Sequence, residues 1–203
     1  ACAYLKDFGA ACASNGSVGL YHIEGLTPEA VEAGESIIRE NAPVYVVDDA
    51  ELERVRQSYP CIWQDLDATP KLCFMGCPHM TLSQLKDWTV RVEKGLQAAG
   101  NKKVLIPTVF TSAPGVVKEF NRTAYAARLR ATGVILSTIC PLMYMNNPLC
   151  KNMPVLTNSN KLRTYTTARY MTDEEITRFV GELKKMIESQ SYDAAFQRAM
   201  EEI

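Results

Sequence analysis

The 203-residue sequence lacks several features that would assign a protein to a class at once. It has no excess of charge of either sign, because 22 basic and 23 acidic side chains leave a net charge of −1. No basic surface for nucleic acid or an anionic membrane is therefore expected. The longest apolar stretch, Val134–Met145, is interrupted by Ser137, Thr138 and Pro141 and is too short to span a bilayer. No leader pattern opens the chain, so we expect a cytoplasmic protein that binds neither nucleic acid nor a membrane.

Cysteine is the one residue type with unusual use, at seven in the chain. This number is odd and too small for a disulfide scaffold, which favours reduced thiols. Neither a Cys-x-x-Cys pair nor a His-x-x-x-His pair occurs. If some of these thiols bind metal or act in chemistry, the evidence must come from their positions in the fold.

Short β-rich stretches alternate with longer helical ones along the chain. This alternation predicts an α/β fold with a mostly parallel sheet of about six strands and helices on both faces. The predicted strands are Ser17–Ile23, Val44–Val47, Lys71–Met75, Val104–Phe110, Gly133–Ile139 and Pro154–Thr157. The predicted helices cover residues 26–41, 48–59, 81–97, 111–130, a segment from 158, 173–188 and 192–203. We expect one α/β region over residues 1–203, with any division into sub-lobes near residues 60–70 or near residue 100.

Polar and reactive residues follow four of the predicted strands. Ligands of such sheets bind outside the carboxyl ends of the strands, so these residues are the candidates for a site. They are Gly76-Cys77-Pro78-His79, Thr111-Ser112, Cys140-Pro141 and Asn158-Ser159-Asn160-Lys161.

Cys77 and Cys140 each precede a proline, which leaves a thiol on a stiff turn, as is common around iron–sulfur clusters. Three other interpretations stay open. Either cysteine can be an apolar core residue. Cys73, Cys77 and His79 with a further cysteine could bind zinc. His79 could also activate Cys77 as a nucleophile.

Lys161 and Arg163 can bind a carboxylate or phosphate through charge-assisted hydrogen bonds. A second interpretation of Asn158 and Ser159 is that they serve only as helix caps, and Thr111 and Ser112 have the same two interpretations. Ser14 and Asn15 lie in a segment whose composition predicts a turn.

The order of these motifs resembles the aconitase X family of hydro-lyases over about residues 9–170. The resemblance rests on Gly9–His22, Gly25–Ala30, Gly76–Leu82, Thr138–Pro141 and Thr157–Lys161. It implies an aconitase-like fold and the C-terminal part of a larger large subunit. The partners that it implies are the N-terminal half of that subunit and a small swivelling domain or subunit. It also implies a small hydroxy acid as substrate.

The resemblance implies an iron–sulfur cluster, [4Fe-4S] or [2Fe-2S], with Cys140 as one ligand and Cys77 as a second. The remaining ligand is expected from the N-terminal half of the large subunit. The expected reaction is dehydration of a hydroxy acid, with a cis-3-hydroxy-L-proline type of substrate favoured over mevalonate 5-phosphate. The chain alone is expected to be inactive.

We assign the catalytic roles to Lys161, which would hold the anionic group, and His79, which would protonate the departing hydroxide. The predicted substrate-binding residues are Ser14, Asn15, Thr111, Ser112, Asn158, Ser159 and Arg163. The alternatives are a non-catalytic α/β binding or scaffold subunit, and a zinc or thiol-redox domain.

Overall fold

A computed structural model describes residues 2–179 of the chain. The helices are α1 (Cys2–Gly16), α2 (Pro28–Ala33), the 3₁₀ helix η1 (Gly34–Ile37), α3 (Asp49–Gln57), α4 (Leu82–Ala98), α5 (Pro114–Phe120), α6 (Ala124–Ala131), α7 (Pro141–Met145) and α8 (Asn160–Tyr165). The strands are β1 (Leu72–Met80), β2 (Thr108–Ser112), β3 (Ile135–Ser137), β4 (Val155–Thr157) and β5 (Arg169–Tyr170). Residues 173–179 are also helical.

The five strands form one parallel sheet in the order β3-β2-β1-β4-β5. The chain leaves β1 toward β2 and β3 and later returns to the other side of β1 for β4 and β5. The strand order therefore reverses between β1 and β4, and ligands of open α/β sheets bind at such a point.

Helices cover both faces of the sheet, as the sequence predicted. Alternate β1 residues belong to two apolar clusters, with Cys73 and Met75 in one and Leu72 and Phe74 in the other. The first cluster packs against α4, α5, α6 and residues 173–179, and the second against α7 and α8. Burial on both faces explains why these strands are nearly all apolar.

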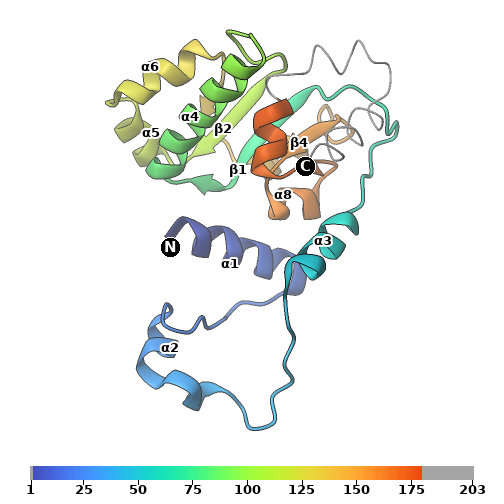
Figure 1. Cartoon of the computed structure of the whole chain (residues 1–203). Helices are drawn as coiled ribbons and strands as arrows, with labels where there is room; N and C mark the ends of the chain where they lie inside the picture. The colour runs from blue at the N-terminus through green and yellow to red at the C-terminus, as the bar shows by residue number, and fades with distance from the viewer. Residues whose placement is uncertain (1, 180–203) are drawn as a thin grey trace.

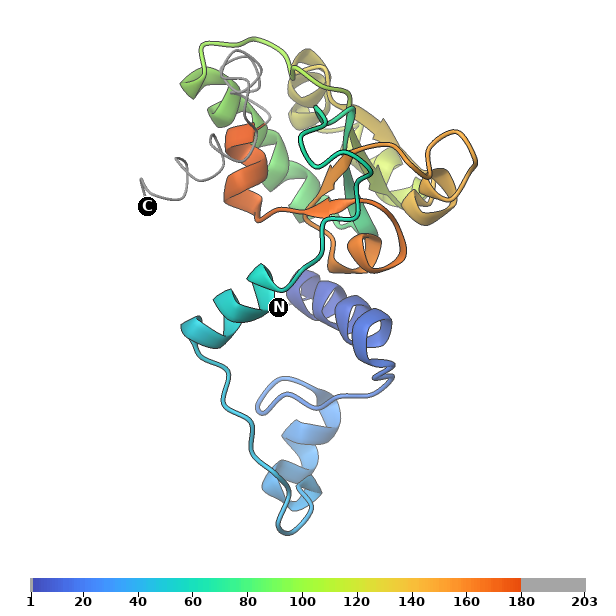
Figure 2. The same ribbon diagram turned by 90° about the vertical axis from the view of Figure 1, so that its right-hand side faces the viewer.

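The N-terminal third of the chain lies outside this α/β body, which we define as residues 70–179. Helix α1 runs beneath the carboxyl edge of the sheet and contacts β1 and α8 (Figure 1). The segment between α1 and α3 extends away from the body (Figure 2). None of the helices within residues 2–179 has the length and apolar character needed to cross a membrane.

Two predicted helix starts are confirmed by their hydrogen bonds. Thr81 Oγ1 accepts from the Gln84 backbone N–H at 3.2 Å, and Gln84 Oε1 accepts from the Thr81 N–H at 3.0 Å. This reciprocal pair is a capping box, which satisfies two N–H groups that the helix itself leaves free. Asp48 caps α3 by accepting from the Glu51 N–H at 2.8 Å.

The expectation of about six strands was slightly high, and two of the predicted strands are wrong. Ser17–Ile23 and Val44–Val47, both inside the described residues, form no strand there. Strand β5 was not predicted, because two residues leave no detectable pattern. The described sheet is therefore smaller, but its parallel character is as expected.

Three helix predictions also need correction. The predicted helix over residues 111–130 starts too early, because Thr111 and Ser112 belong to β2 and Pro114 starts α5. The rest of this range forms two helices, α5 and α6. The predicted helix over 26–41 is α2 followed by η1. The predicted turn near Ser14 is the last turn of α1, where the Ser14 hydroxyl donates to the Ala11 carbonyl at 3.2 Å. The predicted helix over 192–203 lies outside the described residues, as does the end of the one over 173–188.

Candidate active site

The central strand β1 is irregular near its carboxyl end. Its parallel register with β2 is regular from Cys73 to Met75 and resumes only at Met80. Between them Gly76 has φ +105°, and a Cβ there would lie 2.4 Å from the Thr111 carbonyl oxygen. Only glycine fits this combination of backbone conformation and close approach. We call residues 76–79 the cysteine turn.

Two hydroxyls of β2 and one at the N-cap of α8 donate hydrogen bonds to carbonyls of this turn and of the residues beside it. The Thr111 hydroxyl lies 3.3 Å from the Met75 oxygen and 2.8 Å from the Gly76 oxygen. The Ser159 hydroxyl donates to the Cys77 carbonyl. The hydroxyl of Ser112 donates to the Met80 carbonyl at 2.5 Å.

The fourth donor is charged and comes from α1. Lys6 Nζ lies 2.7 Å from the His79 carbonyl oxygen and 3.5 Å from that of Pro78. All six carbonyls from Met75 to Met80 thus have a side-chain donor. Four donors on one short segment hold the backbone around Cys77 in a single conformation.

The two cysteine motifs meet at this edge of the sheet. His79 Nε2 lies 3.3 Å from the carbonyl oxygen of Ile139, the residue before Cys140. Cys140 is half-buried at the N-terminus of α7, and its side chain makes no capping hydrogen bond. Burial raises the pKa of the Cys77 thiol, while the Lys161 ammonium and the Ser159 hydroxyl act in the opposite direction and Cys140 adds to the rise. Cys77, Cys140 and Lys161 are therefore close enough to interact electrostatically.

A cavity of about 310 Å³ opens beside the cysteine turn, at the point where the strand order reverses. Its walls come from α1, the cysteine turn, α4, the segment after β4, and the region of β5. The predicted site residues among its lining are Cys77, Asn158, Ser159 and Lys161. Volumes of this size suit a small molecule.

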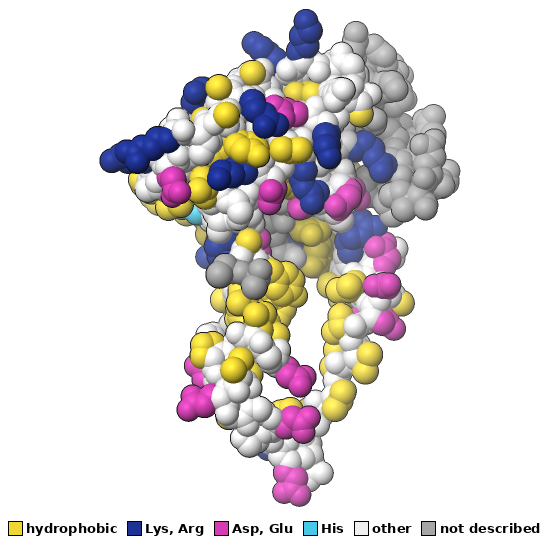
Figure 3. All heavy atoms as spheres, turned by 60° about the vertical axis from the view of Figure 1, so that its left-hand side comes forward, with side chains coloured by type: hydrophobic (Ala, Val, Ile, Leu, Met, Phe, Trp, Pro, Cys, Tyr) yellow, Lys and Arg dark blue, Asp and Glu magenta, His cyan; other side chains and the backbone are white. Residues whose placement is uncertain are grey.

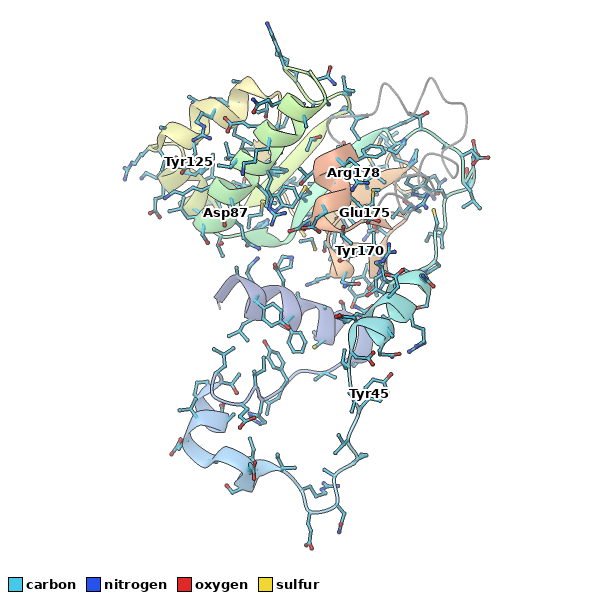
Figure 4. All side chains as sticks on the ribbon, in the orientation of Figure 1. Tyr45, Asp87, Tyr125, Tyr170, Glu175 and Arg178 are labelled. Carbon is cyan, nitrogen blue, oxygen red and sulfur yellow. The ribbon has the colours of Figure 1, made fainter. Side chains whose placement is uncertain are left out.

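Charged groups of both signs line the cavity. Lys161 contributes a cation, and Asp7 and Asp173 contribute carboxylates. Asp173 accepts from the Asn158 amide at 2.9 Å, and Asp7 accepts from the Gln84 amide at 2.9 Å. Tyr170 also lines the cavity and lies on the strand that precedes the helical segment carrying Glu175 (Figure 4). Burial raises the pKa of Tyr170, and nearby Tyr59 and Asp173 raise it further.

Five of the seven predicted binding residues do not line the cavity, and neither do His79 and Cys140. Thr111 and Ser112 instead bond to carbonyls of β1, and the other three lie where α1 meets α8. Arg163 donates to the Asn15 side-chain oxygen at 2.7 Å, and its guanidinium lies 3.8 Å from the centre of the Tyr59 ring. These contacts join α1 and α8. Ser14 bonds to its own helix, and neither it, Asn15 nor Arg163 lines the cavity.

Lys6 and Asp7 were not among the predicted site residues. Both lie on α1, whose small and alternately polar residues did not predict a helix. Asp7 contacts Gln84, which is 77 positions away in the sequence, and Lys6 contacts His79, which is 73 positions away. A pattern along one segment contains no information on such a long-range contact.

Within the described part of the chain, no three His, Cys, Asp or Glu side chains are grouped so that they could hold a metal ion. Cys77 and Cys140 are thus a pair without a third ligand among residues 2–179. A metal centre at this edge would need a ligand from elsewhere.

Comparison with known proteins follows the same division of the chain. The family model of the aconitase X second domain matches residues 2–57, and that of the third domain matches residues 70–190. The chain belongs to the aconitase X family. The second domain supplies α1 and α3, and the third supplies the sheet, so the cavity lies where the two meet.

Similar curated proteins include two dehydratases of different substrate. The chain is 33% identical over 138 residues to the phosphomevalonate dehydratase large subunit of Thermococcus kodakarensis, covering 68% of this chain and 32% of that protein. It is 28% identical to the cis-3-hydroxy-L-proline dehydratase of Pseudomonas aeruginosa, covering 79% of this chain and 27% of the relative.

The crystal structure of Thermococcus kodakaraensis aconitase X in its holo-form is also similar. It superposes with a TM-score of 0.67 at 27% identity, covering 87% of this chain and 44% of that one. The chain thus spans about a third of the length of the curated relatives that it matches. The aconitase-like fold expected from the motifs is confirmed.

Proposed function

We propose that this chain is part of a hydro-lyase that removes water from a small hydroxy acid. The observation that carries the proposal is that Cys77 and Lys161 line one cavity at the reversal of strand order, with His79 two residues after Cys77 and in contact with the residue before Cys140. Two dehydratases in the same family support it. The family and the cavity together favour an enzyme over a scaffold subunit.

The pair of thiols fits the expected iron–sulfur cluster in part. Cys77 and Cys140 would hold it, since thiolates are the usual ligands of both [4Fe-4S] and [2Fe-2S] clusters. A further ligand would come from outside residues 2–179, as the resemblance implies for the N-terminal half of the large subunit. When bound, a cluster iron with an open position supplies a Lewis acid for the departing hydroxyl group.

Lys161 would bind and orient the anionic group of the substrate. Lys161 lines the cavity, and its ammonium can form a charge-assisted hydrogen bond to a carboxylate. Asn158 would present its side-chain oxygen to the substrate, because its amide nitrogen is held by Asp173. His79 would donate the proton that converts the departing hydroxide to water.

Thr111, Ser112 and Ser159 would act through the cysteine turn. All three are buried, and their hydroxyls donate to its carbonyls. They would therefore hold Cys77 in place. Asn15 and Arg163 would bind no substrate directly and would fix α1 against α8, forming the cavity wall. Ser14 would contribute only to the end of α1.

The charges in the cavity favour a zwitterion of the cis-3-hydroxy-L-proline type over mevalonate 5-phosphate. Lys161 suits a carboxylate, and the carboxylates of Asp7 and Asp173 suit an ammonium. The Asp173 carboxylate would repel a phosphate, which carries nearly two negative charges, whereas the Asp7 charge is partly offset by the Lys6 ammonium 3.0 Å away. The cavity offers no cluster of cations to offset that repulsion among its described lining.

We propose that residues 1–203 form the C-terminal part of a larger, cytoplasmic large subunit. Its active form would also contain the N-terminal half of that subunit and a small swivelling domain or subunit. The relatives of similar sequence named as large subunits support this arrangement.

The test is an anaerobic reconstitution of the complete large and small subunits carrying Cys140→Ser or Cys77→Ser. Each variant is expected to lose most bound iron, visible absorbance and turnover, because a hydroxyl is a poor ligand for iron. Cys12→Ser, a half-buried cysteine on α1, is the matched control and should retain all three.

Full iron content and turnover in Cys140→Ser would contradict the ligand assignment. Stoichiometric zinc without iron would favour the zinc or thiol-redox alternative. Turnover is measured with cis-3-hydroxy-L-proline and with mevalonate 5-phosphate, so that the substrate preference is tested separately from the reaction.

A further inference from the structure

The segment between α1 and α3 is an extended arm, which we define as residues 17–49. It leaves the body below α1, carries α2 and η1 at its far end, and returns to α3 (Figures 1 and 2). Its apolar side chains are mostly uncovered, and acidic side chains lie between them (Figure 3). The exposed apolar residues are Val18, Leu20, Leu26, Val31, Ile37, Ile38, Val44, Tyr45, Val46 and Val47. Patches of this extent mark interaction sites.

The returning leg of the arm has the composition of a strand but no partner. Val44–Val47 are four consecutive β-branched or aromatic residues, between 59% and 88% exposed. Successive side chains of an extended chain point to opposite sides, so both sides of this leg are uncovered. No backbone group of these four residues makes a hydrogen bond within the described residues. The Tyr45 hydroxyl donates to the Glu51 carboxylate on α3, so one side chain of this leg is held while its backbone stays unpaired (Figure 4).

The outgoing leg, Ser17–Ile23, has the same character. Leu20 is 71% exposed, and the backbone groups of Gly19–His22 make no hydrogen bond within the described part of the chain. One side chain anchors this leg, since the Tyr21 hydroxyl donates to the Leu5 carbonyl on α1 at 2.9 Å. The start of the leg is therefore fixed, while its strand edges remain free.

The charge of the arm restricts what can cover it. Residues 17–49 contain seven acidic side chains and one basic one, Arg39. Two copies of the arm would repel each other, which disfavours a homodimer through this surface. A covering surface must be apolar at its centre, carry Lys or Arg at its rim, and offer strand edges.

We propose that the arm docks onto the further chain that the longer relatives carry, and that its two legs become strands of a sheet completed by that chain. The relatives named above are about three times as long as the part that this chain matches, so they contain the material for such a surface. The occupant is thus the remainder of the large subunit, with an apolar face bordered by basic residues. This proposal depends on family membership alone, and its test needs no dehydratase activity.

The test is hydrogen exchange on the complete large subunit without substrate. The Val44–Val47 amides are expected to exchange at least about 100-fold more slowly than unstructured amides, because strand pairing protects them. The protection should be the same at all protein concentrations. Exchange at the unstructured rate would overturn the proposal, and protection that appears only at high concentration would assign the arm to a second copy instead.

Val46→Asp is the matching substitution, with Leu149→Asp as its control. Both residues are more than 70% exposed in this structure, but Leu149 lies outside the arm. Val46→Asp is expected to lower the melting temperature of the complete subunit by several degrees and to abolish the amide protection, whereas Leu149→Asp leaves both unchanged. An unchanged melting temperature in Val46→Asp would contradict docking of the arm.

Discussion

Replacing Gly76 by Ala tests whether the cysteine turn depends on close backbone approach. The new Cβ would lie 2.4 Å from the Thr111 carbonyl oxygen, 2.5 Å from its hydroxyl and 2.9 Å from its backbone nitrogen. Strand β2 cannot retreat easily, because it pairs with β1 on one side and β3 on the other. The turn itself must therefore move, and Cys77 with it.

The magnitude follows from three contributions. The positive φ of Gly76 costs an alanine about 1–2 kcal/mol. The contact with Thr111 adds about 1–3 kcal/mol, as overpacking does in a core. Alanine regains about 0.4–1 kcal/mol by restricting the unfolded chain. The net loss is about 1–5 kcal/mol, a large share of the stability of a typical domain.

Two other glycines separate these contributions. Gly100 also has a positive φ, +70°, but a Cβ there meets nothing within 4 Å. Gly100→Ala should therefore cost about 1 kcal/mol or less, the conformational part alone. Gly115 has neither the positive φ nor a close neighbour, and Gly115→Ala in α5 should be neutral or stabilising by up to about 1 kcal/mol.

The assay is urea unfolding followed by the fluorescence of Trp63 and Trp88, which are both buried. The midpoint should fall in the order Gly115→Ala, Gly100→Ala, Gly76→Ala at unchanged slope. If Gly76→Ala costs no more than Gly100→Ala, the close approach to Thr111 is wrong.

Two further substitutions or reactions test the surroundings of the turn. Lys6→Met should lower turnover of the complete enzyme about tenfold at unchanged KM, because about 1.4 kcal/mol of transition-state stabilisation is lost when the cysteine turn is held less firmly. Lys6→Arg should recover part of the turnover, and the control Lys94→Met, on the exposed side of α4, should have no effect. Unaltered turnover in Lys6→Met would exclude a positioning role. Burial raises the pKa of Cys73 from 9.0 to about 12, so iodoacetamide at pH 8 should modify half-buried Cys140 and leave Cys73 intact in the folded protein. The free energy of unfolding that comes from keeping the Cys73 thiol neutral is complete below pH 9 and is lost as the pH rises toward 12. In an alkaline unfolding experiment, Cys73→Ala should therefore lack this part of the pH dependence.

The strands of the body could be predicted because burial on both faces makes them continuous apolar stretches. Lys71–Met75 and Pro154–Thr157 were recognised for this reason, and parallel pairing then placed the residues that follow them at one edge. The juxtaposition of Cys77 with Asn158 and Lys161 was therefore predictable from the sequence. The capping pair at Thr81 was predictable because it depends on residues three apart.

The role of α1 could not be predicted, since its importance comes from contacts distant in sequence. Its segment is rich in alanine with interspersed polar residues, and it has no apolar stripe that would indicate a buried helix. Asp7 and Lys6 become meaningful only once the helix lies under the cysteine turn. The strand predictions at Ser17–Ile23 and Val44–Val47 failed for the opposite reason. Their local pattern is that of strands, but pairing requires a neighbour, and the described residues offer none.

The hydroxyls at the sheet edge show why residue type and position did not decide role. Parallel strands bring Thr111, Ser112 and Ser159 to the carboxyl edge, where substrate binding was the natural expectation. The irregular end of β1 changes this, because a strand that leaves its register exposes carbonyls that β2 no longer pairs. Buried carbonyls need donors, and the nearest hydroxyls supply them. A hydroxyl at a strand end is therefore available as a donor to substrate only if no neighbouring backbone group takes its proton, and here all three donate to carbonyls of β1, although Ser159 also lines the cavity.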